Sequence, residues 1–234
     1  MAITLSHSSK IIKGSIDLTA SKSISNRVLI IKALCANDFK IENLASAKDT
    51  VTLNNLLFNN EEQVFNVGHA GTVMRFLTAY LALKKGEFII TGSERMQQRP
   101  IKLLVDALRA LGAKISYLKN EGYPPLKITG GFISGNEIDI DGGVSSQYIS
   151  ALMLIAPSIK GGLKIQFKNE LISKPYINMT LEIMKDFGAD ISWEEEAVLI
   201  RQGDYKTKDF VVEADWSSSS YWYGIECLDD FFKI

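Results

Sequence analysis

The chain repeatedly places a short run of small and polar residues directly before an apolar stretch of helical length. In residues 18–34, LTASKSISNRVLIIKAL, the first half is polar and the second half is apolar on nearly every side. A helix that is apolar all round is buried in a protein core. We therefore predict a buried helix with a polar first turn. The same pattern recurs at 68–83, 142–157 and 214–227.

A second kind of helix has an apolar stripe on one side only. This pattern predicts amphipathic helices at 47–59, 100–111 and 176–187, the last two followed by Gly112 and Gly188, residues typical of helix ends. Strands are predicted at 3–18 (one or two, around Gly14), 39–44, 63–67, 88–92, 114–118, 126–129, 136–140, 163–167, 191–193, 197–201 and 210–213.

The order of these elements is an internal repeat. RPIKLLVDALRALGAKI aligns with KPYINMTLEIMKDFGADI, so that Pro100 lies 75 residues before Pro175 and Gly112 lies 76 before Gly188. Repeats of this size stack as equivalent layers. We predict a mixed α/β fold of three repeated units around buried helices. Stacking would also gather the polar starts of those helices at one end of the structure.

Composition and charge exclude several classes of protein. The chain has 234 residues, of which 46% are hydrophobic and 23% charged, and its net charge is −1. This is ordinary globular composition, and it argues against nucleic-acid binding through bulk charge. No apolar run has the length of a membrane span, and no signal peptide is visible. Two distant cysteines and two histidines predict no metal site and fit the reducing cytoplasm.

The first polar helix start carries candidate chemistry. Unpaired N–H groups and the positive end of a helix dipole lie there, together with the hydroxyls of Ser21, Ser23 and Ser25 and the cations Lys22 and Arg27. The cluster predicts an anion site for a phosphate or a carboxylate. The alternative is a serine cap beside two solvated cations. The residues that stacking would gather are Lys22, Ser23, Arg27, Thr72, Arg75, Ser145, Ser146 and Gln147.

Seven separated motifs, in order, carry a resemblance to a known family. They are SKSISNR, AGTVMRFL, RMQQRPIKLLVDALRALGA, YPPLKITGG, VSSQYISALMLIAP, SKPYINMTLEIM and EADWSSSSYW. From about residue 12 to about residue 223 the chain resembles the 5-enolpyruvylshikimate-3-phosphate synthases, or 3-phosphoshikimate 1-carboxyvinyltransferases. The resemblance implies transfer of the enolpyruvyl group of phosphoenolpyruvate to the 5-hydroxyl of shikimate 3-phosphate, on the route to chorismate and the aromatic amino acids. It also implies no cofactor and no metal.

The resemblance assigns one set of residues to shikimate 3-phosphate. In that assignment Lys22 contacts both substrates, and hydroxyls bind the 3-phosphate. The assigned residues are Lys22, Ser23 and Arg27 (ring and carboxylate side), Ser145, Ser146 and Ser173 (3-phosphate), Gln147 (between the substrates) and Tyr176 (pocket wall).

A second set is assigned to phosphoenolpyruvate. The resemblance implies that Gly71 allows a close backbone approach and that Arg99 is a charged clamp. Arg75 and Thr72 are secondary candidates. His69, another secondary candidate, stands where the family usually has Asn. Histidine can donate a hydrogen bond from the same place, but its charge depends on pH, so we expect an altered affinity for phosphoenolpyruvate.

The family fold is a two-domain inside-out α/β barrel with substrates bound between the domains. We expect residues 14–213 to form the domain that binds shikimate 3-phosphate. Residues 1–13 and 214–234 would belong to the second domain, which is mostly absent. In the family, later units carry the general acid and base. We therefore expect no catalytic residue here and no activity of the chain alone. Asp215 precedes a serine run and is interpreted as a helix cap.

Three other readings stay open. The chain could be a non-catalytic module that only binds shikimate 3-phosphate. It could be the related UDP-N-acetylglucosamine enolpyruvyl transferase, although that family lacks the SKSISNR pattern and uses a Cys in a mobile loop. A repeat protein without a ligand would leave the cations at the helix starts unexplained. We expect a monomer without nucleic-acid or membrane partners. The apolar tail DDFFKI at 229–234 is a candidate association patch.

Overall fold

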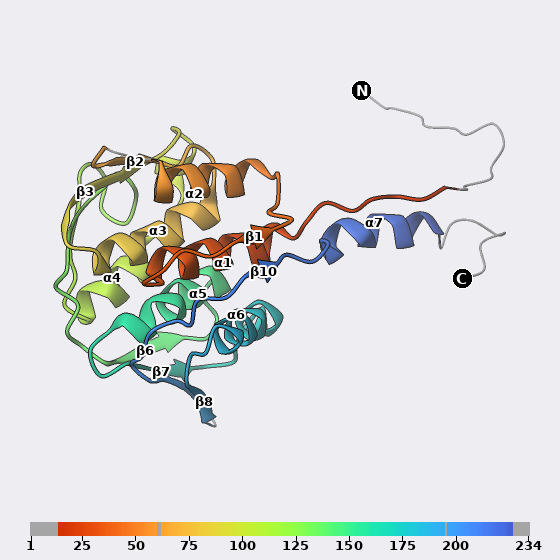
Figure 1. The fold of residues 1–234 in the computed structure, drawn as a ribbon. Helices are drawn as coiled ribbons and strands as arrows, with labels where there is room; N and C mark the ends of the chain where they lie inside the picture. The colour runs from red at the N-terminus through yellow and green to blue at the C-terminus, as the bar shows by residue number, and fades with distance from the viewer. Residues whose placement is uncertain (1–13, 60–61, 195, 227–234) are drawn as a thin grey trace.

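The computed structural model describes residues 14–59, 62–194 and 196–226. Figure 1 shows helices gathered in the middle of the molecule with strands around them. Among the described residues, no helix combines the length and the apolar character that crossing a membrane requires.

The helix predicted at 214–227 is α7 (Trp216–Glu226), which is mostly exposed, so the prediction of burial is wrong there. The other three helices with this apolar pattern are buried and form the core. They are α1 (Lys22–Leu34), α3 (Gly71–Leu83) and α5 (Ser146–Ile155), and α3 packs against both of the others. In α1 every residue from Ile24 to Ile31 is buried. Burial of apolar side chains on all sides of these helices supplies most of the hydrophobic driving force of this fold.

The second and third repeated units have the same topology, which confirms the predicted repeat. In each unit two parallel strands are joined through a buried helix, and an amphipathic helix then leads to an antiparallel pair. The second unit contains β2 (Val64–Asn66), α3, β3 (Gly86–Thr91), the short helix η1 (Met96–Gln98), α4 (Lys102–Ala110), β4 (Lys114–Tyr117) and β5 (Leu126–Gly130). The third contains β6 (Glu137–Asp141), α5, η2 (Ala156–Ser158), β7 (Leu163–Lys168), α6 (Lys174–Asp186), β8 (Ile191–Glu194) and β9 (Ala197–Ile200).

The first unit is shorter and is completed by the far end of the chain. It consists of α1, β1 (Ile41–Glu42) and α2 (Lys48–Phe58), and β1 pairs in parallel with β10 (Phe210–Val211). The strand that follows the third unit therefore returns to the first. This pairing closes the three units around the buried helices.

The chain enters and leaves this body at the same place. The backbone N–H of Ser21 donates to Glu213 O at 2.9 Å, and the N–H of Asp215 donates to Thr19 O at 2.8 Å. Figure 1 shows residues 14–18 and α7 (Trp216–Glu226) extending together to one side. The predicted domain boundaries at 14 and 213 stay a prediction.

One strand prediction is wrong in its described part. Residues 14–18 form no strand, since no neighbouring strand accepts their backbone hydrogen bonds among the described residues; they run extended beside the start of α7. The rest of the predicted strand, at 3–13, lies outside the described residues, and so does the tail at 229–234.

A glycine sets how closely α3 approaches the sheet. A Cβ built on Gly130 of β5 would overlap the carbonyl oxygens of Leu81 and Lys84, which end α3. The backbone of β5 therefore lies directly against the last turn of the helix, and this contact fixes the depth of α3 in the core.

We predict that Gly130→Ala lowers the free energy of unfolding by about 2–3 kcal/mol, because backbone atoms must move to admit the methyl group. Gly203→Ala is the control, since no atom lies within 4 Å of a Cβ at that position. Urea unfolding of both variants measures the difference. Equal effects of the two substitutions would contradict the packing argument.

Candidate anion-binding site

The starts of the buried helices surround one cavity of about 300 Å³. Its lining comes from α1, α3, α5 and α6 and from the segment that leads into α7. The lining residues are Lys22, Ser23, Asn26, Arg27, Thr72, Ser146, Gln147, Tyr176, Asp215 and Ser217. Seven of the residues singled out in the sequence as site candidates are thus brought together from four different helices.

Helical spacing explains why α1 contributes four side chains. Lys22 and Asn26 are four residues apart, as are Ser23 and Arg27, so each pair lies on one face of the helix. The side chain of Ser21 caps α1 by accepting a hydrogen bond from the N–H of Ile24 at 3.4 Å. The first turns of α1, α3 and α5 contain no acidic residue. The positive ends of three helix dipoles are therefore not neutralised locally.

Arg27 is buried and makes hydrogen bonds only to neutral oxygens. Its Nε donates to Thr180 Oγ1 at 2.7 Å and its Nη2 to Ser150 Oγ at 3.1 Å. The carbonyls of Ser23 and Tyr176 accept two further bonds, at 2.8 and 3.4 Å. Burial lowers the pKa of Arg27 to about 10, with Tyr176 acting in the opposite direction, so the guanidinium stays charged at neutral pH. Arg27 thus ties α1 to α5 and α6 and brings an unneutralised charge to the cavity.

The expectation that Ser25 contributes a hydroxyl to the anion site is wrong. Ser25 is completely buried, and its Oγ accepts a hydrogen bond from the N–H of Ala45 at 3.1 Å. Its side chain leaves the helix on the side away from the Ser23 and Arg27 face, because residues two apart on a helix do not share a face. The hydroxyl holds the loop before α2.

Lys22 forms an exposed ion pair with Asp49 that costs little free energy to break. Its Nζ lies 3.5 Å from Asp49 Oδ2, and the two side chains are 47% and 28% exposed. Exposed ion pairs of this kind contribute about 0–1 kcal/mol. Lys22 is therefore available to an anion in the cavity.

Two arginines converge on the start of α3. A Cβ built on Gly71 would overlap Arg99 Nη1 and would lie 2.7 Å from Arg75 Nη1. Glycine at this position lets both guanidinium groups approach the helix backbone. The sequence interpretation of Gly71 as a position of close approach fits this geometry, although here the approaching groups are the two arginines themselves.

Arg75 is buried within this pair. Its Nη1 donates to Gly71 O at 2.8 Å, and its guanidinium lies over the ring of Tyr148, 5.7 Å from the centroid. Burial lowers the pKa of Arg75; Tyr148 acts in the opposite direction, and the neighbouring positive charge of Arg99 lowers the pKa further. Two like charges held this close favour an anion between them.

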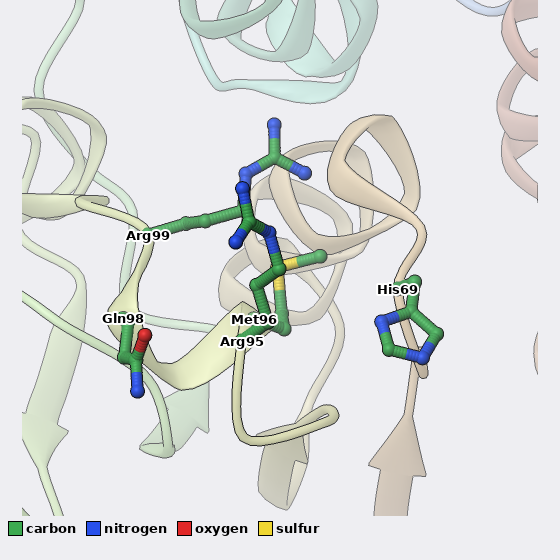
Figure 2. Close-up of a pocket in the computed structure, with 5 residues that line it drawn as sticks. All are labelled: His69, Arg95, Met96, Gln98 and Arg99. Carbon is green, nitrogen blue, oxygen red and sulfur yellow. The ribbon is translucent and has the colours of Figure 1, made fainter. Parts of the chain in front are cut away.

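A second, wider cavity lies beside this pair. It has a volume of about 610 Å³ and is lined by His69, Arg95, Met96, Gln98 and Arg99. Figure 2 shows His69 on one side of it and Gln98 on the other, with Arg95, Met96 and Arg99 between them. The Nδ1 atom of His69 lies 2.8 Å from the Oγ of Ser93. This hydrogen bond orients the imidazole at the edge of the cavity.

Four predicted residues lie outside the lining of both cavities: Gly71 and Arg75, whose contacts are given above, and Ser145 and Ser173. Ser145 is exposed and caps α5, its Oγ accepting from the N–H of Gln147 at 3.4 Å. Ser173 is exposed and adopts a left-handed conformation (φ +59°) directly before α6. The cap interpretation of Asp215 fits the structure, since Asp215 Oδ1 accepts a hydrogen bond from the N–H of Ser217 at 3.1 Å, at the start of α7.

Sequence reasoning missed several residues of this region, among them Arg95, Met96, Gln98 and Ser217 of the two linings. Asn26 lines the first cavity, and neither polar atom of its buried side chain has a hydrogen-bond partner among the described residues. Its spacing of four from Lys22 was the signal that could have found it. Asp49 and Tyr148 carry no such local signal, because their partners are distant in sequence.

The charges of this region are suited to holding anions. Among the described residues, Arg27, Arg75 and Arg99 form no ion pair with a carboxylate. Unneutralised guanidinium groups at helix starts can bind phosphates and carboxylates through charge-assisted hydrogen bonds. Within the same part of the chain, no group of three His, Cys, Asp or Glu side chains could hold a metal ion.

Known proteins resemble this chain in sequence and in fold. The chain is 52% identical over 218 residues to a 3-phosphoshikimate 1-carboxyvinyltransferase of Bacteroides fragilis (strain YCH46), covering 93% of this chain and 53% of that protein. It is 43% identical over 238 residues to the protein of the same name from Sulfurovum sp. (strain NBC37-1), covering 90% and 56%. The fold matches the EPSP synthase structure from Acinetobacter baumannii with a TM-score of 0.77, at 20% identity, over 89% of this chain and 52% of that one.

The chain spans about half the length of the curated relatives that it matches. The family described as EPSP synthase (3-phosphoshikimate 1-carboxyvinyltransferase) matches at residues 7–59 and 52–226, which together cover most of the chain. The motifs, the repeated fold and these matches agree, and the chain belongs to the EPSP synthase family.

Proposed function

We propose that this chain supplies one wall of the substrate site for enolpyruvyl transfer from phosphoenolpyruvate to shikimate 3-phosphate. The observation that carries the proposal is a set of three arginines: Arg27 and Arg75, near the starts of α1 and α3, and Arg99, whose guanidinium lies against the start of α3. None of them pairs with a carboxylate among the described residues. Both substrates are anions, and an unneutralised cation is the group that binds them most strongly.

In this proposal each of the two cavities binds one of the two substrates. The smaller one offers hydroxyl, amide and ammonium groups from Ser23, Ser146, Gln147 and Lys22, which suit a hydroxylated ring that carries a phosphate and a carboxylate. The wider one offers mainly charge, from Arg95 and Arg99, with Arg75 beside it; this suits the small, highly charged phosphoenolpyruvate. Lys22 would lie where the two substrates meet.

The chain alone is proposed to bind without turnover. Transfer needs a proton donor and acceptor at the reacting carbons. In the described lining of the smaller cavity the carboxylate is Asp215, which is engaged in capping α7. The general acid and base would come from the half of the family sequence that this chain does not span. We propose a cytoplasmic setting, in keeping with the free thiol of Cys35.

We predict saturable binding of shikimate 3-phosphate to the 234-residue chain, with a Kd of about 1 mM, because one wall supplies only part of the contacts. Lys22→Met should raise this Kd about tenfold through the loss of a charge-assisted hydrogen bond. Titration followed by amide NMR shifts measures both values.

Lys185→Met is the matched control. Lys185 is 48% exposed and pairs with Glu182 at 3.0 Å, much as Lys22 is 47% exposed and pairs with Asp49. Arg27 is a poor choice for this test, because its loss would leave buried oxygens of α5 and α6 unpaired. No saturation in the unaltered chain, or an equal effect of both lysine substitutions, would refute the proposed site.

We predict no detectable release of phosphate when the chain is incubated with phosphoenolpyruvate and shikimate 3-phosphate together. The expectation follows from the described lining of the smaller cavity, in which the carboxylate, Asp215, is engaged in capping α7. A phosphate-release assay measures it, with a full-length relative as the positive control. Turnover above the background rate would show that this chain holds the catalytic groups.

A further inference from the structure

Tyr148 is a buried polar residue that the proposed substrate contacts do not use. It lies in the first turn of α5, directly after Ser146 and Gln147 of the smaller cavity, and it is 8% exposed. Its hydroxyl donates a hydrogen bond of 2.7 Å to the carbonyl oxygen of Pro100, the residue that follows Arg99. One side chain therefore links the α5 start to the segment that carries an arginine of the wider cavity.

The ring of Tyr148 takes part in an arrangement that occurs twice. Arg27 of α1 lies over the ring of Phe76 in α3, at 5.6 Å, and Arg75 of α3 lies over the ring of Tyr148 in α5, at 5.7 Å. In each case the arginine of one buried helix rests on an aromatic ring of the next. Phe76 has no hydroxyl, so stacking alone does not require one.

The hydroxyl of Tyr148 has two neighbours: it donates to the carbonyl of Pro100, and it also interacts with the guanidinium of Arg75. Arg99 is exposed and lies between η1 and α4, where its backbone N–H donates to Met96 O at 3.0 Å. The bond from Tyr148 to Pro100 holds this segment from its other side. The guanidinium of Arg99 is thereby kept beside Gly71 and Arg75.

We propose that Tyr148 is a positioning residue that fixes the spacing of the Arg75–Arg99 pair and couples it to the start of α5. The ring supports Arg75 and the hydroxyl holds the backbone after Arg99. The proposal rests on the proposed function in one respect, namely that the arginine pair receives an anion. It adds a residue that contacts neither substrate and acts only through the two arginines.

The test uses Tyr148→Phe, which keeps the ring under Arg75 and removes only the hydroxyl. The matched control is Tyr205→Phe. Tyr205 is 4% exposed, and its hydroxyl donates to Leu154 O at 2.8 Å, near the other end of the same helix. Both variants lose one buried hydrogen bond from a tyrosine to a backbone carbonyl that involves α5, so thermal unfolding should show similar losses of stability.

Shikimate 3-phosphate is the probe for the smaller cavity, and inorganic phosphate, titrated with that cavity filled by shikimate 3-phosphate, is the probe for the arginine pair. Tyr148→Phe should raise the Kd for phosphate about threefold to fivefold and leave the Kd for shikimate 3-phosphate within about twofold. Tyr205→Phe should change neither. Equal changes in both tyrosine variants, or an unchanged phosphate Kd in Tyr148→Phe, would overturn the proposal.

A measurement made without any ligand tests the role of Tyr148 independently of the proposed function. The Nε–H signal of Arg99 in NMR should show increased mobility in Tyr148→Phe and not in Tyr205→Phe. If the unaltered chain binds neither phosphate nor shikimate 3-phosphate, the proposed function fails, and the arginine signal alone decides the role of Tyr148. An unchanged Arg99 signal would then refute it.

Discussion

The buried charge of Arg27 is the interaction on which the rest of the structure depends. An unpaired charge in a protein interior is costly, and hydrogen bonds to neutral oxygens offset that cost only in part. Arg27 obtains four such bonds, from its own helix and from α5 and α6. The same contacts that hold three helices together thus leave a positive charge at the cavity. An anion that binds there would stabilise the folded chain by mass action.

The internal repeat explains why positively charged arginines lie together near the starts of the buried helices. Arg27 and Arg75 each donate from Nη1 to the carbonyl of the residue four positions earlier, at 2.8 Å in both cases. Equivalent helices therefore direct equivalent arginines toward their own first turns. Arg27 is the sixth residue of α1 and Arg75 the fifth of α3, whereas the fifth residue of α5 is Ser150, whose hydroxyl accepts a hydrogen bond from Arg27. The arginine of the first unit, Arg27, therefore donates a hydrogen bond to the buried helix of the third unit.

The fold was largely predictable from the sequence, and the site only in part. Apolar residues on all sides correctly indicate that α1, α3 and α5 are buried, and the repeat indicates where their starts meet. The same pattern in α7 is not accompanied by burial. Sequence could not separate Ser25 from Ser23, because the loop contact that withdraws Ser25 involves Ala45, twenty residues away. The role of Tyr148 depends on Pro100, which is 48 residues distant. Such contacts are set by tertiary packing and leave no local trace.

The two cavities differ in how firmly the chain holds their cationic side chains in place before an anion binds. Around the smaller one, Arg27 is locked by buried partners and Lys22 has to give up only a weak, exposed ion pair. Beside the wider one, Arg75 is buried but Arg99 is exposed on a connecting segment that depends on a few backbone contacts. Ordering a flexible charged side chain on binding costs conformational entropy. For the same number of contacts, the smaller cavity should therefore bind its anion more tightly than the wider one.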